Sequence, residues 1–554
     1  MRARRGERGH GAIDDPPCAW LLVAGLFGLA ALSAACGSGA SYEARVDIGP
    51  PTETVLHPEI VGFNTLWPLG GMGSLEDDRQ ALDEARVALL SELRPRLLRY
   101  PGGTISHTFH WSQAIGPVDE RTPQTIPFLE DERFRSFGGK TDRPRYGPAE
   151  FLELCERIGA EPLLVCAFEE GTPEEAAAWV AYLNGDPNDE RRIGTDANGT
   201  DWGTVGEQAG KRVAAGRTDP WGVTWFEVGN ELDLHRFRRT AAEYADAYRR
   251  FRAAMIRVDA NVKVGAVGHN RRGGIGEKDR ELGTGMPWNP TLVTRLGDEI
   301  DFLALHFYAT NDERTDSGYD VLAEPWRHGH ELRAIRDAAR DLRDGRPLPI
   351  AVTEHAVDAR AGGDPSGESN STVRAALAAA DMVLELARSD VRLGCLHVLS
   401  LRWDGPMNPF LHFATILEHR DDLRLAPHFE VMRMLSEGMA GRLCTTTVDV
   451  ASFRPSFDAD IDVPYLSALA SSGTSARVFL VHKHPTRPIT VHLRRAGDAV
   501  PASSIRGTIL THARGSDGAP SEREAVLSSI EPGADSGGAT LVMPPLSFAS
   551  IEIF

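Results

Sequence analysis

The stretch Trp225 to Leu234, "WFEVGNELDL", decides the fold class. It begins as an apolar, β-prone run, breaks at Gly229, and then presents Asn230 and Glu231 side by side. Seven further runs of this kind occur along the chain, at residues 59–64, 97–103, 162–168, 262–268, 301–308, 349–355 and 394–401. Most are nearly continuous apolar segments, which is typical of parallel strands that are buried on both faces.

Amphipathic segments with helical spacing lie between these runs. They span residues 75–93, 148–159, 172–184, 240–258, 331–344 and 372–390. Eight strand–helix units predict an α/β fold, a (β/α)8 TIM barrel over residues 58–425. The length of this region requires long loops, and the candidates are Thr104–Arg145 and Gly185–Asp219.

The pattern changes at Ala426. One helix is followed by short alternating runs separated by turn residues, which predicts a C-terminal antiparallel β-sandwich in a domain over residues 426–554. Residues 37–57 are predicted to be a linker, and their run "YEARVDIG" is a candidate extra strand of the sandwich.

The first 36 residues are predicted to be an export signal. Basic residues precede the apolar stretch Trp20–Ala35, and Cys36 then begins a polar segment. This order resembles a bacterial lipoprotein signal with Cys36 as the lipidated residue; a simple secretory leader or an N-terminal membrane anchor is the alternative. The predicted location is a membrane-anchored lipoprotein, otherwise periplasmic or secreted.

Composition limits the partners. The chain has 554 residues and a formal net charge of −19, which argues against nucleic acid and anionic membrane surfaces as partners. Membrane contact is expected only through the N-terminal anchor, and a homo-oligomer is left open.

Two strand ends carry the residues that point to chemistry. Glu231 and Glu354 end the fourth and seventh runs, so a barrel would place them opposite each other at its mouth. A pair of opposed carboxylates is what glycosidic hydrolysis requires. Arg99 could keep Glu354 ionised, and His306 and Tyr308 could orient it or contact sugar. Rival acids are Glu227, Glu169 and Glu170.

The aromatic residues Trp67, Trp111 and Trp403 fall near strand ends. They are predicted to be stacking platforms for sugars, with core packing as the alternative. His107 and His110 form too weak a pattern to predict a metal site, because no third ligand matches their spacing.

The segments "RYPGGTISHTFHWSQAIGPVDERTPQ", "YGPAEFLELCERIGAEPLLVCAFEEGTPEEAAAWVAYLNGDPND", "WFEVGNELD" and "LALHFYA" together resemble α-L-arabinofuranosidases of glycoside hydrolase family 51. The resemblance implies a retaining hydrolase with Glu231 as general acid/base and Glu354 as nucleophile. It further implies that Asn230 binds the sugar 2-hydroxyl and that Arg99 supports the nucleophile. It implies no metal or organic cofactor and a carbohydrate substrate, expected to be arabinofuranosyl side chains of plant-type polysaccharides.

The chain also departs from the family pattern. Thr104 replaces an Asn, the nucleophile lies in "TEHA" instead of "DEW", and "FNTLW" and "DLHRF" are unusual. A clan relative with another glycone, β-xylosidase-like or β-glucuronidase-like, therefore stays open. So does a surface lipoprotein that binds carbohydrate without catalysis.

Overall fold

The computed structural model describes residues 42–75, 81–126, 139–234, 238–310, 320–358, 366, 368–404, 409–420, 422–458, 460–473, 475–515, 519–535 and 538–554. The predicted leader and Cys36 lie outside these residues. Within them, no helix combines the length and the apolar character that crossing a membrane requires.

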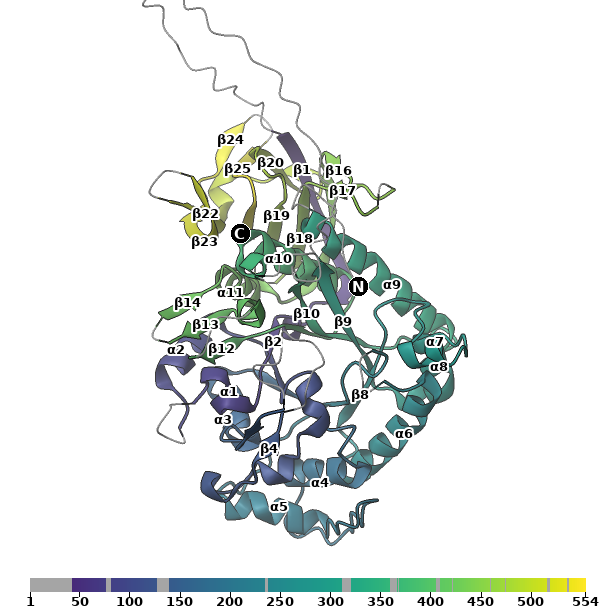
Figure 1. The fold of residues 1–554 in the computed structure, drawn as a ribbon. Coiled ribbons are helices and arrows are strands. Elements are labelled where there is room, and N and C mark those ends of the chain that lie inside the picture. The colour runs from purple at the N-terminus through teal and green to yellow at the C-terminus, as the bar shows by residue number, and fades with distance from the viewer. Residues whose placement is uncertain are drawn as a thin grey trace, which may run out of the picture. The chain divides into compact units, whose positions relative to one another are not determined.

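The eight predicted runs form a closed parallel barrel, which confirms the (β/α)8 prediction (Figure 1). Around the barrel the strand order is β10-β11-β2-β3-β6-β7-β8-β9. Their bounds are β2 Gly62–Asn64, β3 Leu97–Tyr100, β6 Glu161–Cys166, β7 Trp225–Val228, β8 Lys263–Val267, β9 Phe302–Thr310, β10 Ile350–Asp358 and β11 Leu393–Leu396.

The predicted helices are present with shifted bounds. The helices of the barrel region are α1 Pro68–Gly73, α2 Glu84–Leu93, α3 Pro148–Ile158, α4 Pro173–Asn184, α5 Val205–Ala214, α6 Ala241–Val258, α7 Glu277–Glu281, α8 Trp288–Leu296, α9 Glu324–Asp341 and α10 Val373–Arg388. The segment Gly185–Asp219, expected to be a loop, contains α5 with a capping box formed by Thr204 and Glu207.

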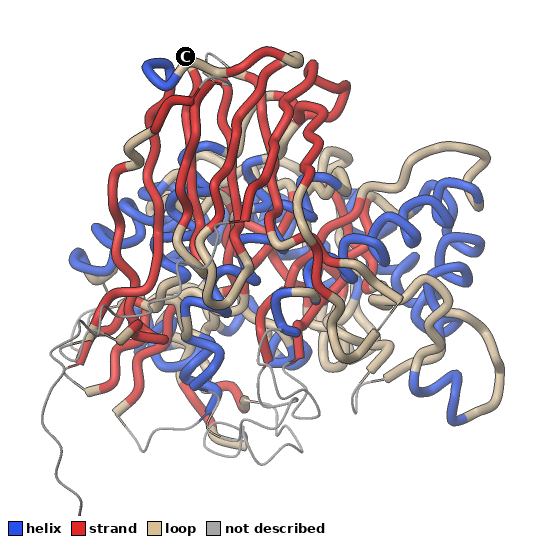
Figure 2. Tube along the Cα trace, turned by 90° about the horizontal axis from the view of Figure 1, so that it is seen from above, coloured by secondary structure: helices blue, strands red, loops and turns tan. Residues whose placement is uncertain are grey.

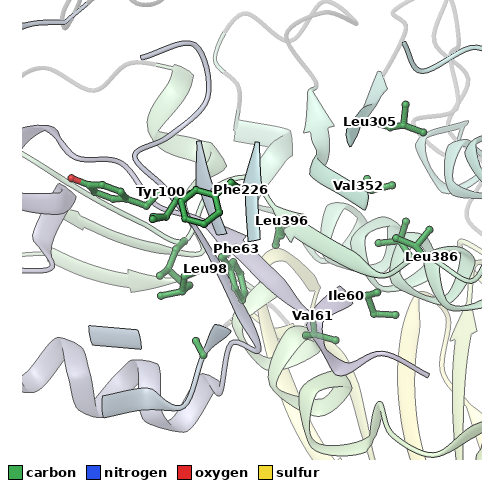
Figure 3. Close-up of a cluster of buried hydrophobic side chains, with 14 of the residues drawn as sticks. Ile60, Val61, Phe63, Leu98, Tyr100, Phe226, Leu305, Val352, Leu386 and Leu396 are labelled. Atoms are coloured by element: carbon green, nitrogen blue, oxygen red, sulfur yellow. The ribbon is translucent and has the colours of Figure 1, made fainter. Parts of the chain in front are cut away.

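Leu98 and Phe226 face away from the barrel interior. They belong to the apolar cluster that packs the barrel against its helices (Figure 3). Successive side chains of a strand point to opposite faces, so the next residues, Arg99 and Glu227, point into the barrel. Both line an interior cavity. The alternation of side chains along β3 and β7 thus places Arg99 and Glu227 in the cavity inside the barrel.

The C-terminal part is one sheet of eleven strands, preceded by α11 His428–Gly438. Its strands run side by side in Figure 2, and β1, Tyr42–Val55, lies among them. The other strands are β15 Arg442–Asp449, β18 Leu466–Ser472, β19 Ala476–His482, β20 Ile489–Arg495, β21 Asp498–Ala499, β22 Ile505–Arg514, β23 Pro520–Ser529, β24 Gly533–Asp535, β25 Gly538–Met543 and β26 Ser547–Ile553.

The sheet is antiparallel with one exception. β1 pairs antiparallel with β15 and parallel with β20, in the register Ala44 with Val491. Apolar side chains from β1, β18, β19, β20, β25 and β26 share one core. The sheet also contacts the barrel region through an ion pair between Lys483 and Asp381 of α10, whose atoms Nζ and Oδ2 lie 2.6 Å apart and are fully buried.

Candidate active site

Four barrel strands, β3, β7, β8 and β9, with the turns that follow them, bring polar side chains to a cavity of about 240 Å3. Most of its lining residues lie at or just beyond the carboxyl ends of the strands, which is where active sites of such barrels are found. The polar residues that line it are Arg99, Glu227, Asn230, Glu231, Asp233, Asn270, His306 and Tyr308.

Arg99 on β3 is the centre of this polar network. Its side chain is fully buried, and Nε donates to Glu227 Oε2 at 2.8 Å while Nη1 donates to Glu354 Oε1 at 2.9 Å. Nη2 donates to Asn230 Oδ1 at 2.8 Å, and Nη1 also reaches Asn64 Oδ1 at 2.8 Å. Burial alone would lower the pKa of Arg99, but the carboxylates of Glu227 and Glu354 raise it. The guanidinium therefore stays charged.

Glu354 on β10 is held as a carboxylate. Besides Arg99, the Tyr308 hydroxyl donates to its Oε2 at 2.5 Å. Burial acts to raise the pKa of Glu354, but the nearby His306, His397 and Arg99 outweigh burial and lower it. Burial and the carboxylates of Glu354 and Glu231 raise the pKa of Tyr308 well above its usual range. Tyr308 therefore remains a neutral donor to an ionised Glu354.

Glu231 reaches the cavity through a turn that follows β7. Gly229 has φ of 79°, where an added Cβ would lie 2.8 Å from Leu232 Cδ1, and Glu231 itself has φ of 47°. A non-glycine residue in this left-handed region is uncommon, and strained residues of this kind cluster at functional sites. The turn places Glu231 Oε1 2.9 Å from His306 Nδ1.

His306 on β9 lies between the two carboxylates. Its Nδ1 is also 3.6 Å from Glu354 Oε2, and one oxygen of each carboxylate and one ring nitrogen all lie within 4.8 Å of one another. Burial would lower the pKa of His306, but Glu354 and Glu231 raise it. The two acids on either side of the imidazole therefore outweigh its burial.

Asn230 and Gly103 complete the surroundings of Glu354. The Asn230 backbone carbonyl accepts from His107 Nε2 at 2.7 Å, and its Oδ1 is held by Arg99. A Cβ on Gly103 would lie 2.5 Å from Glu354 Oε1. Only a residue without a side chain fits there without moving that carboxylate.

The predicted tryptophans do not line this cavity. Trp67 and Trp111 are each 1% exposed and belong to the hydrophobic core. The Trp111 ring stacks on Trp179 at 6.2 Å, and its Nε1 donates to the Glu175 carbonyl. Both rings therefore pack in the hydrophobic core, which is the alternative to sugar stacking that the sequence left open. Trp403 on β12, Ser400–Trp403, is half-buried beside the apolar cluster that includes Tyr308, and its sugar contact stays a prediction.

Two residues of the polar network around Arg99 were not assigned this role from the sequence. Asn64 donates through Nδ2 to the Thr353 carbonyl at 2.8 Å while its Oδ1 accepts from Arg99. Its only signal was its place at the end of the first run. Glu227, a rival acid in the sequence, anchors Arg99, and its signal was a lone charge in an apolar strand. The other rivals pair elsewhere, Glu169 with Arg239 and Glu170 with His110.

Known proteins resemble this chain in sequence. The family model described as the α-L-arabinofuranosidase 1 domain matches residues 89–324. An intracellular exo-α-L-arabinofuranosidase of Bacteroides ovatus is 29% identical over 221 residues, 40% of this chain and 36% of that protein. The α-L-arabinofuranosidase C of Emericella nidulans is 28% identical over 243 residues, 43% of this chain and 42% of that protein. The match thus spans less than half the length of these curated relatives.

Solved structures resemble it over nearly its whole length. The GH51 arabinofuranosidase of Xanthomonas axonopodis pv. citri has a TM-score of 0.73 at 17% identity and covers 93% of this chain and 100% of its own. An arabinose complex of the Thermotoga maritima α-L-arabinofuranosidase has a TM-score of 0.67 at 22% identity, with 93% and 100% covered. The structural likeness establishes the fold, and with the sequence matches it confirms the resemblance to GH51 α-L-arabinofuranosidases.

Replacing Glu231 by Gln is expected to lower the pKa of His306, because the hydrogen bond and the charge of Glu231 both raise it. The measurement is a histidine NMR titration with selectively labelled protein. His110 provides the matched control, since Glu175 is the largest cause that raises its pKa. Glu175→Gln should lower the pKa of His110 and leave His306 unchanged. An unchanged His306 in Glu231→Gln would contradict the described contact.

Proposed function

We propose that this protein is a retaining exo-α-L-arabinofuranosidase. The observation that carries the proposal is the closeness of Glu231 and Glu354 at the mouth of the barrel, where an oxygen of one lies within 4.8 Å of an oxygen of the other. Retaining glycosidases hold their two carboxyl groups about 5–5.5 Å apart, whereas inverting enzymes leave about 6.5–9.5 Å for a water molecule. The close spacing favours direct attack on the sugar by one of the carboxylates.

Glu354 is proposed as the nucleophile. Its ionised state, secured by Arg99 and Tyr308, suits attack on the anomeric carbon. As the new bond to a Glu354 oxygen forms, the bond from the anomeric carbon to the leaving oxygen breaks. Arg99 contacts Oε1 and Tyr308 contacts Oε2, so both oxygens are held in place during attack.

Glu231 is proposed as the general acid and base. It donates a proton to the leaving oxygen in the first step and takes one from water in the second. The water oxygen then attacks the anomeric carbon and releases Glu354, with net retention. His306, between the two carboxylates, can hold a proton close to Glu231.

The arabinofuranosyl glycone is supported by the similarity to named α-L-arabinofuranosidases. A glucuronide is a poorer fit, because its carboxylate would enter a cavity lined by Glu227, Glu231 and Asp233. We take side chains of plant-type polysaccharides as the substrate and, from the leader-like residues 1–36, a location outside the cytoplasm.

The proposal is tested with a panel of aryl glycosides on wild type, Glu231→Ala and Glu354→Ala. Wild type should cleave α-L-arabinofuranosides in preference to β-xylosides and β-glucuronides, and both variants should lose turnover. Azide should rescue both on activated substrates, with a product of retained configuration from Glu231→Ala and of inverted configuration from Glu354→Ala. Full activity in either variant would refute the assigned roles, and preference for a xyloside would refute the glycone.

Gly103→Ala should lower kcat by at least about 100-fold, since displacement of a reacting group by about 1 Å has effects of this size. The cause is the predicted Cβ position, 2.5 Å from Glu354 Oε1. Steady-state kinetics with circular dichroism as a check of folding measures it. Gly210→Ala on α5 is the matched control, because its Cβ would meet nothing within 4 Å, and it should retain full kcat. Equal kcat in the two variants would contradict the contact.

A further inference from the structure

One ring nitrogen of His306 and one carboxylate oxygen each of Glu231 and Glu354 lie close together. A single nitrogen, Nδ1, faces both carboxylates, at 2.9 Å from Glu231 Oε1 and 3.6 Å from Glu354 Oε2. The other nitrogen, Nε2, lies 3.2 Å from Thr353 Oγ1. A divalent cation that binds Nδ1 would take the place of the proton in the contact between Nδ1 and Glu231, while Nε2 stays beside the Thr353 hydroxyl.

From this geometry we propose that Glu231, His306 and Glu354 also form an inhibitory binding site for a zinc-like divalent cation. One imidazole nitrogen and two carboxylate oxygens are a ligand set that zinc accepts, with a fourth position open to water. Bond lengths of about 2.0–2.2 Å place neighbouring ligand atoms about 3.4 Å apart in a tetrahedral site. The two separations from Nδ1 bracket this distance, and the third, at most 4.8 Å, requires only a small rotation of the partly exposed Glu231.

The surroundings of the three ligands favour a cation as well. The contact between His306 Nε2 and the Thr353 hydroxyl is the kind of outer contact that orients a metal-binding imidazole. Glu227 lines the same cavity and is 1% exposed, and its Oε1 has no hydrogen-bond partner in the described part of the chain. This unpaired oxygen adds negative potential to the floor of the cavity.

A bound ion would block the proposed reaction. It would occupy an oxygen of Glu354 and an oxygen of Glu231, the residues proposed to attack the sugar and to transfer the proton. The site is therefore inhibitory and not a cofactor site. Inhibition should be competitive, because sugar and ion need the same oxygens.

A second histidine in the chain contacts two carboxylates and serves as the matched control. His110 Nδ1 lies 3.0 Å from Glu175 Oε1, whereas its other nitrogen, Nε2, lies 3.7 Å from Glu170 Oε2. The two carboxylates thus lie on different edges of the ring, so one ion cannot bind both of them together with a single nitrogen.

The test is a Co2+ titration of the full chain without substrate, followed by visible absorption and isothermal titration calorimetry. One Co2+ should bind per chain and be displaced by Zn2+. His306→Asn should weaken binding by at least about 10-fold, which is the usual loss for even an outer contact of a metal ligand. Glu231→Gln is a second, nearly isosteric probe with the same expected direction, and His110→Asn should bind as wild type does.

The absence of a one-to-one complex would overturn the proposal, and so would unchanged binding in His306→Asn and Glu231→Gln or lost binding in His110→Asn. If wild type cleaves aryl arabinofuranosides, Zn2+ should raise the apparent KM and leave kcat unchanged, and a fall in kcat alone would also overturn it. The Co2+ complex is observed without substrate. The binding test therefore gives its result even if the protein does not hydrolyse arabinofuranosides.

Discussion

One buried cation organises the site. Arg99 lies inside the barrel with no exposed surface, so its charge must be balanced within the protein. Glu227 and Glu354 supply that balance from two other strands, and Asn230 and Asn64 accept the remaining hydrogen bonds. Loss of Glu227 or Glu354 would break a buried ion pair, which costs about 3–5 kcal/mol. The same contacts fix the orientation of Glu354 and Asn230.

The division of charge gives the two carboxylates different surroundings. Glu354 has a fixed cation on one oxygen and a phenol on the other, whereas Glu231 contacts an imidazole and is more exposed. In glycosidases, unequal surroundings of this kind shift the pKa values of the two carboxyl groups apart, so that one can act as an acid and the other as a nucleophile. Two glycines shape the backbone around these residues. Gly103 lets the loop after β3 approach Glu354, and Gly229 lets the chain turn after β7.

Much of this arrangement follows from the sequence. Continuous apolar runs predict the eight parallel strands, and strand parity places Arg99 and Glu354 inside one barrel. The burial of Trp111 against Trp179 depends on how a long loop folds back, which local periodicity does not encode. The same holds for the parallel pairing of β1 with β20, since 447 residues separate Ala44 from Val491. Residues such as Asn64 act through contacts between strands far apart in the chain, so their roles emerge only from the barrel register.

The account depends most directly on a covalent bond between the sugar and Glu354. Reaction of Glu231→Ala with an activated aryl α-L-arabinofuranoside should accumulate a glycosyl-enzyme, because the base for the second step is missing. Mass spectrometry of the intact chain and of its peptides should find the added mass of one pentosyl unit on Glu354. Release of the aryl group without such an adduct, or an adduct on Glu227 or Glu169 instead, would contradict the account.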